Sequence, residues 1–71
     1  MANVLTAPIP GVVLEIKVTE GQIVAENETI LVLESMKMEN DITTYYGGTV
    51  SKILVKKGDT VNSEDALVEI E

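Results

Sequence analysis

The chain contains an internal repeat. When residues 11–34 are aligned with residues 48–71, an offset of 37 residues, seven of the 24 positions are identical without a gap. The identical pairs are Gly11/Gly48, Val13/Val50, Ile16/Ile53, Val18/Val55, Gly21/Gly58, Val24/Val61 and Glu34/Glu71. Both copies have the order Gly-x-Val, strand, glycine, short strand, acidic turn, strand. The simplest structure with this order is two interlocked copies, related by a pseudo-two-fold axis, that together close a flattened barrel.

Alternating apolar residues predict that the domain is all-β. Across residues 12–18, Leu14, Ile16 and Val18 share one face and the charged residues between them share the other, which is the period of a half-buried strand. The run Thr29–Glu34 is more densely apolar and indicates a strand covered on both faces. Two further strands are predicted at Ser51–Lys56 and Leu67–Glu71. No segment shows a helical period over ten residues.

Length and composition limit the size and type of the core. With 71 residues the chain is long enough for one small domain, so we expect residues 1–71 to fold as a single unit. The hydrophobic share is 45%, yet the sequence has no Phe and no Trp. Because valine and isoleucine dominate, the core is expected to be aliphatic and built from strands.

Charge and missing residue types exclude several functions. The net charge is −7, from twelve carboxylates against five lysines, so nucleic acid and anionic lipid are not expected partners. The chain has no histidine or cysteine, which removes the commonest general base, the commonest zinc ligand and thiol chemistry. We therefore expect no catalytic residue and no metal site. We also expect no direct membrane insertion, because no apolar run is long enough, and a cytoplasmic location.

The stretch ESMKMEN, residues 34–40, lies where the two copies join. Glu34 closes the first copy, so the following residues form a bridge that is predicted to be a tight turn at Met36-Lys37 and an outgoing strand. This places Lys37 at a hairpin tip, at the opposite end of the barrel from the C-terminus. Met-Lys is poor turn chemistry, because neither residue is a Gly, Asn or Asp that accepts unusual backbone angles. Such residues at a turn indicate a role other than folding.

Three interpretations of this lysine compete. In the first, Lys37 is an ordinary solvated charge, and Met36 and Met38 are core methionines. In the second, Lys37 is a catalytic amine, which is disfavoured because Glu34 and Glu39 would keep it charged. In the third, the exposed amine is an attachment point, and a group tethered there reaches its targets at high effective concentration. Carboxylates beside it would then be recognised by a modifying enzyme, and the methionines would supply adaptable apolar contacts.

These residues resemble a known family. Glu34–Glu39, ESMKME, is similar to the biotinylation motif of biotin carboxyl carrier proteins and biotinyl domains. Ala7–Gly11 resembles the entry motif of the same family, and Val50–Val61 resembles the segment that follows its lysine hairpin. The resemblance therefore covers nearly the whole chain. The sister lipoyl domains have Asp-Lys-Ala at the lysine, whereas this chain has methionine on both sides. Only Thr19-Glu20 separates the first strand from Gly21, which leaves no room for the protruding thumb of some bacterial carriers.

The resemblance implies a flattened barrel of two four-stranded antiparallel sheets, with biotin joined to Lys37 by a biotin protein ligase. It assigns Met36 and Met38 to recognition or ring contact and, more weakly, Glu34, Ser35 and Glu39 to recognition by the ligase. The attached biotin would carry CO2 between the active site of a biotin carboxylase and that of a carboxyltransferase or decarboxylase. The domain itself would be non-catalytic.

Two other functions stay open at this point. A lipoyl-type acyl carrier shares the fold and the lysine. A purely structural β-barrel interaction domain would leave Lys37 unmodified. Detection of biotin or the intact mass of the protein would separate these possibilities.

Overall fold

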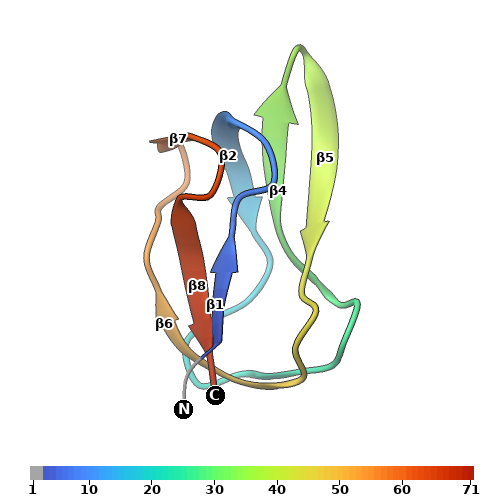
Figure 1. Cartoon of the computed structure of the whole chain (residues 1–71), viewed down its shortest axis with the longest axis vertical. Coiled ribbons are helices and arrows are strands. Elements are labelled where there is room, and N and C mark those ends of the chain that lie inside the picture. The colour runs from blue at the N-terminus through green and yellow to red at the C-terminus, as the bar shows by residue number, and fades with distance from the viewer. Residues whose placement is uncertain (1–2) are drawn as a thin grey trace.

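The computed structural model describes residues 3–71, and within them the chain forms eight strands and no helix (Figure 1). The strands are β1 (Asn3–Thr6), β2 (Gly11–Ile16), β3 (Ile23–Val24), β4 (Thr29–Ser35), β5 (Met38–Thr43), β6 (Gly48–Ile53), β7 (Thr60–Val61) and β8 (Ala66–Ile70). No helix capable of crossing a membrane is found in this part of the chain.

The strands form two four-stranded antiparallel sheets that lie face to face. Their strand orders are β1-β8-β6-β3 and β5-β4-β2-β7. The molecule is elongated, with extents of 33 × 17 × 17 Å, and the β4–β5 hairpin reaches furthest at the end opposite the C-terminus (Figure 1). The predicted all-β flattened barrel of two four-stranded sheets is therefore confirmed, and so is the placement of the hairpin and the C-terminus at opposite ends.

The pseudo-two-fold relation is present in the backbone hydrogen bonds. The Gly21 N–H donates to the Val50 carbonyl at 2.7 Å, and the Gly58 N–H donates to the Val13 carbonyl at 2.7 Å. These two bonds are related by the offset of 37 residues, and each joins one copy of the repeat to the other. The positive-φ residues of the two acidic turns, Asn27 and Glu64, are related in the same way. The copies are therefore interlocked, as the repeat predicted.

One part of the strand prediction is wrong. The pairing of β2 with β4 shifts register between Val13 and Glu15, so Leu14 is the extra residue of a bulge. Val13 is fully buried, whereas Leu14 is only half-buried and lies outside the core cluster. The bulge therefore takes Leu14 out of the expected pattern, whereas the alternation beyond it is confirmed: Ile16 and Val18 pack in or against the core, and Glu15 and Lys17 are exposed. The symmetry-related shift lies between Val50 and Lys52.

The bounds of β2 and β6 also differ from the predicted ones. Both strands begin at the repeated glycine, Gly11 or Gly48, and both end two to three residues earlier than expected, at Ile16 and Ile53. Each glycine lies against a carbonyl of the neighbouring strand, where an added Cβ would collide with the backbone of Glu34 or Glu71. The glycines thus start the strands because only a residue without a side chain allows this close approach.

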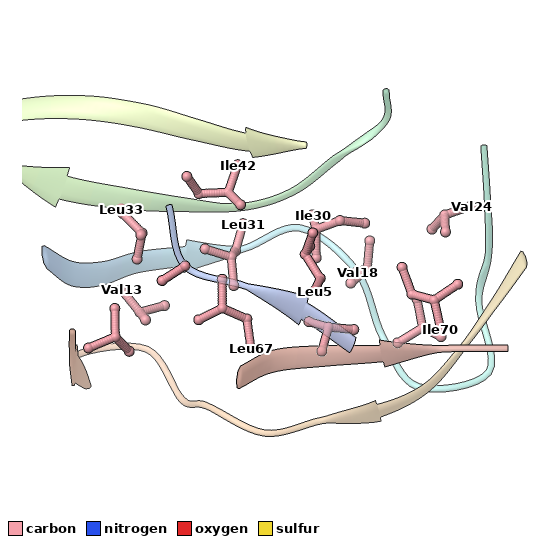
Figure 2. Close-up of a cluster of buried hydrophobic side chains, with 14 residues drawn as sticks. Leu5, Val13, Val18, Val24, Ile30, Leu31, Leu33, Ile42, Leu67 and Ile70 are labelled. Atoms are coloured by element: carbon pink, nitrogen blue, oxygen red, sulfur yellow. The ribbon is translucent and has the colours of Figure 1, made fainter. Parts of the chain in front are cut away.

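The core is aliphatic and lies between the two sheets (Figure 2). Four consecutive residues of β4, from Ile30 to Leu33, are at most 5% exposed, which confirms that this strand is covered on both faces. Thr44 is the buried polar residue among those described, and its hydroxyl is satisfied by the backbone N–H and carbonyl of Tyr46, each at 2.9 Å. The burial of β4, an inner strand of its sheet and one arm of the hairpin, anchors the hairpin to the core.

The core predicts different costs for two leucine truncations. Leu67 is fully buried, so Leu67→Ala should lower the free energy of unfolding by about 2–5 kcal/mol. Leu54 is 41% exposed, so Leu54→Ala, the matched control, should cost less than about 1 kcal/mol. Urea denaturation followed by circular dichroism measures both. Equal losses for the two variants would show that the core is not centred where the structure places it.

Candidate functional site

The tip of the β4–β5 hairpin is a two-residue turn. Ser35 pairs with Met38 across the hairpin, which leaves Met36 and Lys37 as the connecting residues. Their φ angles are 55° and 65°, so both lie in the left-handed region. Positive φ at both central residues defines the type I′ turn, which matches the twist of the two flanking strands. The structure therefore places Lys37 at the tip of a tight turn, as predicted.

The turn has the conformation that its residues tolerate least. A left-handed backbone costs a residue with a Cβ about 1–2 kcal/mol, and type I′ turns are usually built from Asn-Gly or similar pairs. Here the positions are occupied by methionine and lysine. The turn is held by the ladder between β4 and β5 and by the burial of β4. Since folding alone would favour other residues at the tip, these two side chains serve another purpose.

The side chains at the tip point into solvent. Met36 is 92% exposed and Met38 is 67% exposed, so the interpretation of these methionines as core residues is wrong. Lys37 is exposed as well. The one ion pair found within residues 3–71 joins Lys17 to Glu15 at 3.0 Å, away from the tip. The Lys37 amine is thus presented without an ion-pair partner from the described part of the chain.

Two carboxylates lie just below the tip. Glu34 and Glu39 are directly opposite each other across the hairpin, and both are exposed. Because Leu33 is fully buried, its neighbour Glu34 points to the outer face of the sheet, and its partner Glu39 shares that face. Like charges in this position destabilise a strand pair. The structure therefore brings Glu34 and Glu39 together one residue pair below Ser35 and Met38, and Ser35 is half-buried at the base of the turn.

The base of the hairpin is tightly held. A Cβ at Gly11 would lie 2.5 Å from the Glu34 carbonyl oxygen, so β2 approaches the hairpin as closely as a backbone can. On the other strand, the Asn40 side-chain amide donates to the Met38 carbonyl at 3.2 Å. Neither Gly11 nor Asn40 was predicted to support the hairpin. The glycine repeated at position 48 was the available signal for the close approach.

The hairpin tip has the features of a site that displays one side chain to another protein. Within residues 3–71 no group of three or more His, Cys, Asp or Glu side chains is arranged to hold a metal ion. The hairpin offers one primary amine, two flexible apolar side chains and a pair of carboxylates on a firmly anchored base. Such an arrangement can display the amine to another protein and carry whatever is bonded to it.

Comparison with known proteins agrees with this description. The profile of the Biotin_lipoyl family, described as biotin-requiring enzyme, matches residues 1–70. The chain is 48% identical over 69 residues to the biotin carboxyl carrier protein of Streptococcus mutans, covering 97% of this chain and 53% of that protein. It is 46% identical over 70 residues to the human mitochondrial propionyl-CoA carboxylase alpha chain, covering 99% of this chain and 10% of that protein.

A solved structure is similar as well. The urea carboxylase of Kluyveromyces lactis aligns with a TM-score of 0.93 and 28% identity, covering 100% of this chain and 6% of the urea carboxylase chain. The fold, the hairpin and these matches define a class, the non-catalytic carrier domain. The chain belongs to the biotin-requiring enzyme family, and its biotin carboxyl carrier relatives imply covalently attached biotin as the cofactor. It spans about half the length of the Streptococcus mutans carrier and a tenth of the human carboxylase chain.

The strained turn makes a prediction about stability. Asparagine tolerates the left-handed region, so Met36→Asn should raise the free energy of unfolding by about 0.5–1 kcal/mol. Met38 lies in β5 with extended backbone, where asparagine is disfavoured, so Met38→Asn should give no gain. The measurement is the urea midpoint of both variants. If Met36→Asn is no more stable than the parent, then the turn stores no strain.

Proposed function

We propose that residues 1–71 form one biotin carrier domain and that biotin is attached to Lys37. The observation that carries this proposal is the position of the Lys37 amine, at the tip of a left-handed turn between two exposed methionines. The residues fit the group, because an exposed primary amine is what an amide bond to the carboxyl carbon of biotin requires. When bound, biotin supplies a ring that accepts CO2 and passes it on.

The hairpin residues would have separate roles. Lys37 forms the attachment and provides the flexible part of the arm. Met36 and Met38 offer soft apolar surface to the carried ring or to a partner's active site. Glu34 and Glu39, together with Ser35, are the candidate contacts for a biotin protein ligase, because they lie at the base of the turn in fixed register with the lysine. A rigid base orients the arm, so the tethered group meets its targets at an effective concentration of about a millimolar.

The relatives support particular partners. They are named propionyl-CoA carboxylase, pyruvate carboxylase and, in the structural comparison, urea carboxylase. We infer that the domain works with a biotin carboxylase and with a carboxyltransferase or decarboxylase, as subunits or as domains of a longer chain. The acceptors differ among these relatives, so the proposal names none. The match to a bacterial carrier is compatible with a cytoplasmic location, which stays a prediction.

A lipoyl-type acyl carrier is the second candidate, because the family profile covers both cofactors. Methionine on both sides of Lys37 and the carboxylase names of the relatives favour biotin over lipoate. A streptavidin blot of the protein purified from cells with an active biotin ligase distinguishes the two, since lipoate gives no signal.

The proposal predicts one biotin per chain, located on Lys37. Lys37→Arg should keep the fold and lose all modification, because arginine preserves the charge but has no primary amine. Lys17→Arg is the matched control, in the loop that follows β2, and it should be biotinylated to the same extent as the parent. Intact mass and peptide mapping measure both. Biotin found on Lys17, Lys52, Lys56 or Lys57 would refute the assignment.

A further inference from the structure

A groove of about 160 Å³ lies between the end of β1 and the end of β5. Its lining residues are Leu5, Thr6, Pro8, Asp41, Ile42, Thr43 and Tyr45. Leu5 and Ile42 are buried and belong to the core cluster, whereas the other lining residues are exposed. The groove therefore has an apolar floor and polar or aromatic walls.

The groove lies on the pseudo-two-fold axis, but its two sides carry different residues. Three pairs of its lining residues are related by the offset of 37: Leu5/Ile42, Thr6/Thr43 and Pro8/Tyr45. The symmetry mate of Asp41 is Val4, which does not line the groove, and the mate of Tyr45 is a proline. The closure of the barrel accounts for the floor but not for a carboxylate and a 75% exposed aromatic ring on one side only. Both belong to the segment that leads directly from Lys37.

We propose that this groove is a docking site for the ring of the biotin carried on Lys37 of the same chain, an inference that rests on the proposed function. Asp41 is four residues beyond Lys37, or about 13 Å along an extended strand. About eleven single bonds separate the lysine Cα from the biotin ring, and an extended chain advances roughly 1.2 Å per bond, which gives about 13 Å. β5 runs back from the hairpin tip toward the middle of the molecule (Figure 1), so an arm folded along it brings the ring to the Asp41 end of the groove.

The chemistry of the groove suits this occupant. Biotin has a small, fused, largely apolar ring system with a urea group whose N–H groups are hydrogen-bond donors. Asp41 and Tyr45 are exposed lining residues that offer acceptor oxygens for those donors and an aromatic surface, and Leu5 and Ile42 supply the buried floor. A space of this volume holds a small ring such as benzene, and it is smaller than the pockets that enclose a drug-sized ligand. The bicyclic ring of biotin is larger than benzene, so the open groove covers one face of the ring and does not take the whole arm.

The tether makes weak binding sufficient. Because the ring is held near the groove at an effective concentration of about a millimolar, an intrinsic dissociation constant of about a millimolar gives roughly half occupancy. Free biotin at micromolar concentration would leave the groove nearly empty. Docking of this strength shelters the ring when no partner is bound and releases it readily when one is.

Nuclear magnetic resonance of the unmodified and biotinylated domain tests the proposal, with intact mass confirming one biotin first. The expected result is a change in backbone amide shifts at residues 41–45 and at Leu5 and Thr6, with through-space contacts between the biotin ring and the Tyr45 ring. Changes confined to residues 35–39 in a protein that carries biotin would overturn the docking site and leave the carrier function intact. Absence of biotin by mass would instead overturn both.

Variants provide a second readout. In the biotinylated domain, Tyr45→Ala and Asp41→Ala should each raise the rate of capture by avidin up to about twofold, because half of the rings are otherwise sheltered. Tyr46→Ala is the matched control, since Tyr46 does not line the groove, and it should leave the capture rate unchanged. Equal capture rates for Tyr45→Ala, Asp41→Ala and the parent would contradict the proposal.

Discussion

Pairing between the two copies of the repeat is the constraint on which this domain depends. β2 pairs with β7 and β3 with β6, so strands of the first copy are completed by strands of the second. A copy on its own would expose the apolar inner face of its strands and leave their edges unpaired. In a chain of 71 residues without Phe or Trp, this interlocking is how an aliphatic core becomes closed. The rigidity of the hairpin base follows from it, because β4 is buried on both faces.

The symmetry also separates what folding requires from what function requires. Paired features, such as the glycines at positions 11 and 48, are explained by backbone approach and recur in both copies. Unpaired features concentrate on one segment, from the turn at Met36-Lys37 to Tyr45. The turn is built from residues that disfavour its backbone angles, and the carboxylates below it face each other across the strands. The left-handed turn and the opposed carboxylates both cost folding free energy, and both are explained by a hairpin that presents an amine and the group bonded to it.

Much of this arrangement could be predicted from the sequence. The repeat predicted the closed barrel, and the position of Glu34 at the end of the first copy predicted the turn at Lys37. The bulge at Leu14 was missed, because it depends on how Val13 and Glu15 pair with β4, and a single strand read in isolation carries no information about its partner's register.

The groove was missed for a related reason. Its floor joins Leu5 and Ile42, which are far apart in the sequence and meet only once the barrel has closed. Periodicity within a segment identifies the faces of strands, whereas a groove between two sheet edges is a property of the assembled fold. The resemblance to biotinyl domains carried the functional prediction, and composition alone would have left the lysine an ordinary surface charge.

Exchanging the two turn residues shows whether a rigid hairpin presents the amine in one position. The double variant Met36→Lys with Lys37→Met keeps composition, charge and both neighbouring carboxylates. Its modification by a biotin protein ligase, with biotin and ATP, is followed by intact mass, and circular dichroism verifies the fold. Misplacement of a reacting group by about 1 Å can cost a hundredfold in rate, so we expect a folded protein that stays essentially unmodified. Labelling of the exchanged lysine at a rate near that of the parent would contradict it, because the ligase would then be reading a flexible sequence and not a fixed geometry.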